Sequence, residues 1–183
     1  ISALARISRA LNNIGIALFR FDYTGLGASS GDFADSNFSS NVGDLIAAAN
    51  FMRDNFSAPQ ILVGHSLGGT AAIAASHEIP EIKAVATIGS PCDSSHVQHN
   101  FAHHIDEIQS KGEAEVMLGG AKFNIKKQFL DDINNQDMPS KIRNLRKPLL
   151  IMHSPVDQIV GIENAQRIYE LARHPKSFIS LDT

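Results

Sequence analysis

The sequence predicts a single α/β domain built on a mainly parallel sheet flanked by helices. Short apolar runs of strand length alternate with longer amphipathic or alanine-rich runs of helix length along most of the 183 residues. Strands joined by crossovers of ten or more residues pair in parallel, and the crossover helices cover the sheet. The 43% hydrophobic content is enough to bury one substantial core, so we expect one domain over residues 1–183.

The first half of the chain supplies three of the predicted strands. Residues 1–12 place apolar side chains at helical spacing and predict a helix. Residues 15–21 form a short apolar run that leads into a glycine-rich turn, which predicts a buried strand. Three consecutive polar residues offer caps for a second helix: Ser39, Ser40 and Asn41. Three more elements follow, namely a strand over 61–63, a helix over 67–78 and a strand over 84–88.

The regular alternation breaks after Pro91. Residues 115–125 consist of two alternating runs about Gly119-Gly120, which predicts a hairpin, and residues 127–135 predict a helix. Because this part interrupts the strand–helix rhythm, we interpret residues 92–145 as a lid or cap insertion over one edge of the sheet. The alternation resumes with three elements: a strand over 149–153, a helix over 162–173 and a strand over 177–181.

The segment Gly64-His65-Ser66-Leu67-Gly68 stands where a predicted strand meets a predicted helix. In one interpretation Ser66 is a nucleophile on a strained turn that lifts its hydroxyl clear of the sheet. In the other, Ser66 is an ordinary helix cap with small neighbours. The strand–turn–helix setting favours the nucleophile, because Gly64 and Gly68 lack a Cβ and allow the strand and the helix to approach closely.

A serine nucleophile needs an oxyanion donor, a base and a carboxylate that orients the base. The helix after Ser66 points its N–H groups at the serine, and Leu67 is predicted to supply one oxyanion donor. Asp157 follows the predicted strand over 149–153, at the edge where catalytic groups converge in open α/β sheets. Asp157 is therefore the predicted acid. Two alternatives stay open: Asp157 as a simple turn cap, and Asp93 as the acid.

Three segments resemble the α/β-hydrolase superfamily and occur in the order found there: residues 20–29, 64–69 and 149–157. Three others resemble, more narrowly, the hydrolase half of bacterial proteins that fuse such a domain to an OsmC-like domain: residues 37–42, 126–132 and 174–178. The resemblance covers essentially the whole chain. It implies an α/β-hydrolase fold, a serine hydrolase activity and a fused OsmC-like partner domain.

In this fold the histidine base follows the acid in chain order, and the resemblance places it just beyond Thr183. His174 precedes the last predicted strand and would lie at the wrong edge. One oxyanion donor normally comes from a loop that would precede Ile1. We therefore expect a chain truncated at both ends, with negligible turnover when isolated, whereas the intact parent hydrolyses acyl substrates.

No metal or cofactor is expected. Four histidines could place three imidazoles on one helical face, as a zinc site needs: His96, His99, His103 and His104. No cysteine or carboxylate completes a recognised metal motif, so we favour a solvated lid face. Gly25-Leu26-Gly27 lacks the third glycine of a dinucleotide fingerprint and is interpreted as a turn. Cys92 and His65 are interpreted as packing residues.

Composition argues against several partners. The formal net charge of −3 comes from interspersed acids and bases, which predicts no nucleic-acid-binding face. No apolar run reaches the roughly 20 residues that span a bilayer, so no membrane partner is expected. The single cysteine fits a reducing compartment, and we expect the cytoplasm.

The leading hypothesis is a serine hydrolase that cleaves a carboxylic ester or thioester of a small-molecule acyl substrate through an acyl-enzyme on Ser66. The alternatives are an acyltransferase and a non-catalytic scaffold for a fused partner. Three aromatic residues are expected either to line the substrate pocket or to pack in the core: Tyr23, Phe33 and Phe38. Apolar residues of the insertion favour a hydrophobic substrate portion: Phe101, Met117, Phe123 and Phe129.

Overall fold

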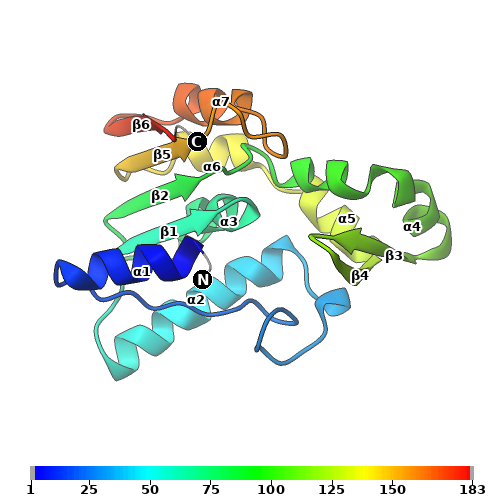
Figure 1. The fold of residues 1–183 in the computed structure, drawn as a ribbon, viewed down its shortest axis with the longest axis horizontal. Helices are drawn as coiled ribbons and strands as arrows, with labels where there is room; N and C mark the ends of the chain where they lie inside the picture. Colours follow the sequence, from blue (N-terminus) through cyan, green and yellow to red (C-terminus); the bar gives the residue numbers. More distant parts are fainter. Residues whose placement is uncertain (1–2, 182–183) are drawn as a thin grey trace.

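A four-stranded parallel sheet forms the centre of the protein (Figure 1). The computed structural model describes residues 3–181, and the predicted first helical residues, 1 and 2, lie outside them. The strands are ordered β1-β2-β5-β6 across the sheet, and every neighbouring pair is parallel. Their bounds are β1 Ile61–His65, β2 Ala84–Ile88, β5 Leu149–His153 and β6 Lys176–Ser180. The α/β fold class predicted from the sequence is thereby confirmed.

The buried core lies between one face of this sheet and a set of helices. On β1, Leu62 and Gly64 turn toward this core, whereas Ile61 and Val63 on the opposite face are exposed. The helix α3 is alanine-rich and buried along nearly its whole length, which suits a helix packed between a sheet and other helices. The helices of the main body are α2 Phe38–Asn55, α3 Leu67–Ala75, α6 Met138–Arg143 and α7 Glu163–Leu171.

Residues 92–134 project from the sheet as a separate layer, on the right-hand side of Figure 1. Its elements are η2 Ser94–His104, α4 Ile105–Lys111, β3 Glu113–Leu118, β4 Ala121–Lys126 and α5 Lys127–Asn134. The predicted hairpin is confirmed as the antiparallel pair β3–β4. The helix α6 falls within the predicted insertion but packs on α3 and α7 of the main body.

The aromatic residues of this layer build its own core. The rings of Phe101 and Phe129 lie 6.3 Å apart and both side chains are buried, while Phe123 packs 4.8 Å from Phe33 of η1 (Phe33–Asp35). Met117 is exposed on the hairpin. The expectation that this set lines a hydrophobic substrate pocket is therefore wrong for the buried pair. Phe33 anchors the layer, and Phe38 is fully buried in the main core.

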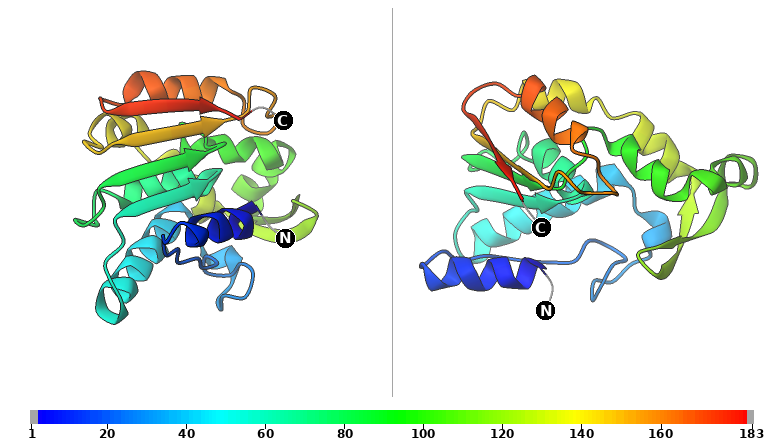
Figure 2. Two further views of the ribbon diagram at one scale, coloured as in Figure 1. Left: turned by 60° about the vertical axis from the view of Figure 1, so that its left-hand side comes forward. Right: turned by 45° about the horizontal axis from the view of Figure 1, so that its top comes forward.

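The prediction of a buried strand over residues 15–21 is wrong. The helix α1 (Ala3–Asn13) forms as expected, but residues 16–22 adopt neither helix nor strand. Phe19 and Phe21 in this segment are 45% and 37% exposed. A strand needs a neighbour to pair its backbone groups, and within the described residues the only ladder partner of β1 is β2. Figure 2 shows α1 and the segment after it running beside the sheet rather than within it.

The start of α2 also differs from its prediction. Asn37, not Ser39, Ser40 or Asn41, is the N-cap, and its side chain accepts a hydrogen bond from the backbone N–H of Ser40 at 2.8 Å. The Ser40 hydroxyl in turn accepts from the Asn37 N–H, which completes a capping box. The Asn37 amide also donates to Gln128 of α5 at 2.6 Å, so this cap ties α2 to the projecting layer.

None of the helices within residues 3–181 is long and apolar enough to cross a membrane.

The two asparagines at the start of α2 provide a matched test of the cap. Asn37→Ala removes the capping box and the bond to Gln128, and we expect the free energy of unfolding in urea to fall by about 1–2 kcal/mol. Asn41→Ala lies inside the helix, where alanine is the better helix former, and is expected to change stability by less than about 0.5 kcal/mol. Equal losses for both variants would contradict the assignment of Asn37 as the cap.

Candidate active site

Ser66 lies on a sharp turn between β1 and α3. Its backbone has φ 52° and ψ −133°, a conformation that non-glycine residues rarely adopt. The Ser66 N–H donates to the carbonyl of Ile88 at the end of β2, and its carbonyl accepts from the Gly69 N–H, both at 2.9 Å. The side chain makes no capping hydrogen bond to the helix. This geometry is typical of a nucleophile elbow, and although Ser66 stands at the N-cap position of α3, its side chain does not cap the helix.

Two glycines allow the strand and the helix to meet so closely. A Cβ on Gly64 would overlap the backbone of Gly68 and lie 2.5 Å from the Cα of Gly69. A Cβ on Gly69 would overlap the Ser90 hydroxyl. A Cβ on Gly68, in contrast, would meet the Tyr23 side chain at 3.7 Å and 3.9 Å, which are ordinary contacts. The close approach therefore depends on Gly64 and Gly69, and the predicted requirement for Gly68 is wrong.

The first helical residue after the elbow is Leu67. N–H groups in the first turn of a helix have no acceptor within the helix, and the helix dipole adds a partial positive charge at that end. The Leu67 N–H is thus available beside Ser66, whose side chain is partly exposed. The main chain here can stabilise an oxyanion that forms at a carbonyl attacked by Ser66.

Asp157 follows β5 and lies in a tight turn. Its Oδ1 atom accepts two hydrogen bonds, from the N–H of Ile159 at 2.9 Å and from that of Val160 at 3.0 Å. Its Oδ2 atom has no such backbone donor and lies 3.8 Å from Nε2 of His153. The carboxylate is therefore held by backbone donors through one oxygen only.

These surroundings keep the Asp157 carboxyl ionised. Partial burial, the largest single influence, raises its pKa, but the N–H groups of Val160 and Ile159 and the nearby imidazoles of His153 and His65 together outweigh it. The pKa of Asp157 consequently lies below its ordinary value. An ionised carboxylate is the form that can hold a histidine base in one tautomer.

Ser66 and Asp157 lie at the same edge of the sheet. They follow β1 and β5, which are both neighbours of β2, and all three strands run in the same direction. Gly89, just past β2, lies between them: a Cβ there would come 3.2 Å from Asp157 Oδ2 and 4.0 Å from Nε2 of His65. The φ of Gly89 is 53°, which also favours glycine.

The sequence interpretation missed Gly89 and His153. Gly89 follows a predicted strand next to the motif strand, and a lone glycine at a strand end is a signal of close approach. His153 is the last residue of β5, four residues before the acid, and its spacing alone gave no sign that it contacts the turn. His65, which was expected to be a packing residue, is in fact exposed, and its imidazole faces the gap beside Asp157.

The other candidate residues take ordinary roles. The Asp93 carboxylate accepts from the N–H and the hydroxyl of Ser95 and caps η2, so it is already engaged. Cys92 is buried, and this burial raises the pKa of its thiol to about 11, which makes it a poor nucleophile. His174 precedes β6 and lies at the end of the sheet away from Asp157.

The histidine-rich segment does not form a helical face of ligands. A 3-10 helix with a kink at Phe101 carries it, and the His96 and His99 rings stack edge to face at 4.8 Å. Within residues 3–181 no group of three or more His, Cys, Asp or Glu side chains is placed to hold a metal ion. Burial and the neighbouring His99 lower the pKa of His96, against the opposite influence of Glu163, Asp157 and Asp93. His96 of the projecting layer therefore lies within electrostatic range of Asp157.

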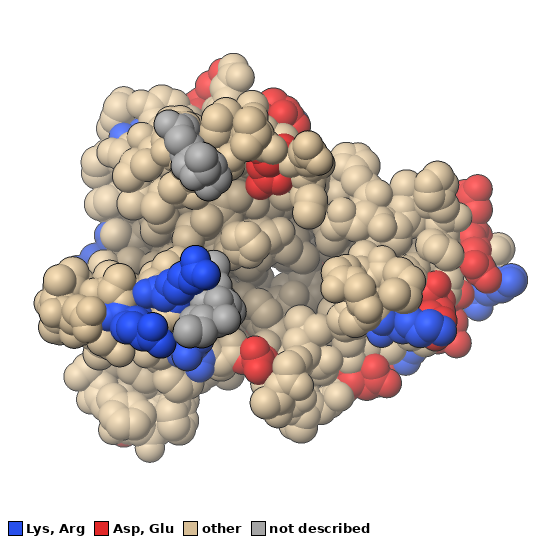
Figure 3. All heavy atoms as spheres, viewed as in Figure 1, with Lys and Arg blue, Asp and Glu red and all other residues tan. Residues whose placement is uncertain are grey.

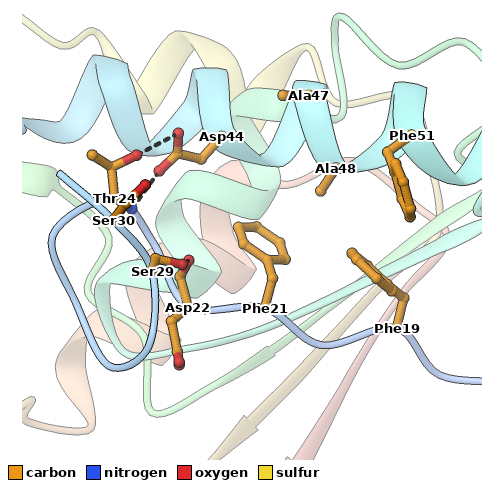
Figure 4. Close-up of a pocket in the computed structure, with 10 residues that line it drawn as sticks. All are labelled: Phe19, Phe21, Asp22, Thr24, Ser29, Ser30, Asp44, Ala47, Ala48 and Phe51. Atoms are coloured by element: carbon orange, nitrogen blue, oxygen red, sulfur yellow. Dashed lines mark hydrogen bonds between the residues drawn. The ribbon is translucent and has the colours of Figure 1, made fainter.

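A cavity of about 430 Å³ lies away from this site, between α2 and the segment that follows α1. Aromatic and alanine side chains form one wall and polar side chains the other end (Figure 4): Phe19, Phe21, Phe51, Ala47 and Ala48 on the wall, with Asp22, Thr24, Ser29, Ser30 and Asp44 at the end. Asp44 accepts from both the N–H and the hydroxyl of Thr24.

Figure 3 shows the hollow between the sheet and the projecting layer, with Lys and Arg gathered over α1 and over the far end of that layer.

The strand–turn–helix elbow at Ser66 and the parallel sheet flanked by helices are typical of an α/β hydrolase. The sequence profile of the family described as serine aminopeptidase, S33, matches residues 1–111, and the chain belongs to this family of hydrolases. The solved esterase domain of a Rhodothermus marinus protein is similar: it is 48% identical, with a TM-score of 0.76, and the match covers 98% of this chain and 70% of that one.

A mitochondrial palmitoyl-protein thioesterase, ABHD10 of Rattus norvegicus, is 30% identical over 162 residues, which cover 84% of this chain and 53% of that protein. The structure of mouse alpha/beta hydrolase domain-containing protein 10 superimposes with a TM-score of 0.72 at 24% identity, and covers 97% of this chain and 74% of that one. The chain spans about half the length of the curated relatives it matches.

The glycines of the elbow can be tested as a pair. Gly64→Ala forces a Cβ into the backbone of α3, and we expect the free energy of unfolding in urea to fall by about 1–3 kcal/mol. Gly68→Ala places a Cβ in open contact within a helix and is expected to raise stability by about 0.5–1 kcal/mol. A comparable loss for both substitutions would show that the close approach is not confined to Gly64.

The lowered pKa of Asp157 predicts a dependence of stability on pH. The folded state favours the ionised carboxyl, so this contribution is full above the unfolded pKa of about 3.9 and is lost as the pH falls through the lower folded value. We expect the difference in unfolding free energy between the parent chain and Asp157→Asn to be constant from about pH 7 to 5 and to shrink below about pH 4. A difference that grows on acidification would contradict the assignment.

Proposed function

We propose that this domain is a serine hydrolase that cleaves carboxylic esters or thioesters through an acyl-enzyme on Ser66. The observation that carries the proposal is the positive φ of Ser66 on a strand–turn–helix elbow, where its side chain makes no capping hydrogen bond to α3. Asp157 at the same sheet edge, anchored through Oδ1 alone, supports the proposal as the acid.

The proposed reaction has two steps. Ser66 Oγ attacks the carbonyl carbon of the substrate while a histidine base takes the hydroxyl proton, and the Leu67 N–H donates to the resulting oxyanion. The carbon–oxygen or carbon–sulfur bond to the leaving group then breaks, and the protonated base returns the proton to that group. Water, deprotonated by the same base, attacks the ester on Ser66 and releases the acid. Asp157 Oδ2 holds the base in its productive tautomer throughout.

We place this base outside residues 3–181. The end of β6 supports this placement, because the Leu181 N–H donates to the carbonyl of His153 at 2.9 Å, so β6 ends beside the last residue of β5, the strand that Asp157 follows. The second oxyanion donor is likewise proposed to come from outside the described residues. On this proposal the 183-residue chain by itself has negligible turnover.

The substrate class is an acyl ester or thioester of a small molecule. The names of similar proteins, an esterase domain and a palmitoyl-protein thioesterase, support this class. The resemblance of residues 37–42, 126–132 and 174–178 supports an OsmC-like domain as the fused partner. The single buried cysteine supports a reducing compartment such as the cytoplasm, whereas the similar thioesterases are named as mitochondrial.

The test uses the longest natural form of the protein, with the 183-residue chain alongside it. We expect a fluorophosphonate probe to label Ser66 in the longer form and p-nitrophenyl esters to be hydrolysed. Ser66→Ala is expected to abolish labelling and lower kcat/KM by about 10³-fold or more, and Asp157→Asn to lower it by about 10³–10⁴-fold. Fluorophosphonate labelling is followed by mass spectrometry, and hydrolysis by absorbance.

Two controls separate the alternatives. Ser39→Ala removes a hydroxyl that donates to Asp132 of α5, and it is expected to leave both signals unchanged. Labelling and hydrolysis that are identical in the parent and in Ser66→Ala would refute the proposal and favour a scaffold. Transfer of the acyl group to an added alcohol or amine in preference to water would identify an acyltransferase that uses the same residues.

A further inference from the structure

The side chain of His153 is buried at the end of β5. It is 1% exposed, and its Nε2 atom lies 2.7 Å from the carbonyl oxygen of Val160. A carbonyl oxygen can only accept, so Nε2 bears the hydrogen and donates it to Val160. The imidazole thus spans the turn that begins at Ser154 and contains Asp157.

Val160 is held from both sides of its backbone. Its carbonyl accepts from His153, and its N–H donates to Asp157 Oδ1 at 3.0 Å. The Ile159 N–H donates to the same oxygen, and the Asp157 N–H donates to Ser154 at 3.2 Å. The position of the carboxylate therefore depends on the position of Val160, and His153 is the side chain that fixes it.

We propose that His153 is a positioning residue that holds Asp157 in the orientation needed to bind the histidine base. This inference rests on the proposed serine hydrolase function. His153 is not itself the base, because its Nε2 hydrogen is committed to Val160 and the ring is sealed from solvent. It acts on the reaction only through the turn.

The anchoring leaves Oδ2 as the working oxygen. Oδ2 faces Gly89, which has no side chain to cover it, while Oδ1 is occupied by two N–H groups. Other charged or titratable side chains within electrostatic range of Asp157 come from other elements: His65 of β1 and His96 of η2. Neither bonds the turn, so neither can replace the mechanical role of His153.

The first experiment follows the Asp157 carboxyl by ¹³C NMR during a pH titration of the 183-residue chain. His153→Leu removes the donor to Val160, and we expect the apparent pKa of Asp157 to rise toward its ordinary value of about 3.9 because the N–H contacts loosen. His153→Gln keeps a donor at the place of Nε2 and is expected to retain the lowered pKa. If glutamine raises the pKa as much as leucine does, His153 acts by charge and the positioning role is refuted.

A matched control uses His77, whose Nε2 also bonds a backbone carbonyl, that of Lys141 at 2.9 Å, at the other end of α3. His77→Leu is expected to leave the pKa of Asp157 unchanged. A shift in His77→Leu equal to that in His153→Leu would show that general loosening of the fold causes the effect, and would overturn the inference.

The second experiment measures kinetics in the form of the protein that hydrolyses esters. His153→Leu is expected to lower kcat by about 10²-fold with little change in KM, and His153→Gln by less than about threefold. In an Asp157→Asn background, His153→Leu should have no further effect, because its action passes through that carboxylate. An equal loss in both backgrounds refutes the inference. Unchanged kinetics in Ser66→Ala would instead refute the hydrolase function, while the titration still decides the role of His153.

Discussion

The site depends on one backbone conformation, the positive φ of Ser66. A non-glycine residue holds such a conformation, at a cost of about 1–3 kcal/mol, only when its surroundings enforce it. Two features hold Ser66 in this conformation. The backbone of α3 packs directly against β1 at Gly64, and the Ser66 N–H donates a hydrogen bond to the carbonyl of Ile88. The Ser66 side chain does not cap α3 in this conformation. On the proposed function, the strained turn is what presents its oxygen for attack.

Parallel pairing then places the remaining groups. Since β1, β2 and β5 are consecutive neighbours with one direction, their carboxyl ends bring Ser66, Gly89 and Asp157 to one edge. The backbone bonds between Ser66 and Ile88 and between Gly89 and Met152 continue the ladder past the strands. The relative positions of these residues at the edge are therefore set by the hydrogen bonding of the sheet.

The sequence was sufficient where a local pattern determines the outcome. The strand at 149–153 and the β3–β4 hairpin were predictable, because apolar alternation and a Gly-Gly turn act over a few residues. The conformation of residues 16–22 was not predictable in this way, because an apolar run becomes a strand only if a neighbouring strand pairs with it. That pairing depends on tertiary structure. For the same reason Ser66 and Asp157 could be named as candidates, while His153 could not: its contact with Val160 exists only once the turn has closed.

The two oxygens of the Asp157 carboxylate differ in their contacts because the turn after β5 closes around one of them. A carboxylate that swings freely can bond a base through either oxygen in many geometries, and most of these misplace the imidazole relative to Ser66. Occupation of Oδ1 by two amides leaves a single oxygen and a single direction, toward Gly89. The absence of a side chain at Gly89 is then as necessary as the presence of His153, since any Cβ there would crowd Oδ2 at 3.2 Å. On the proposed function, two amides at Oδ1 fix the orientation of Asp157, and the missing side chain of Gly89 leaves Oδ2 open to the base.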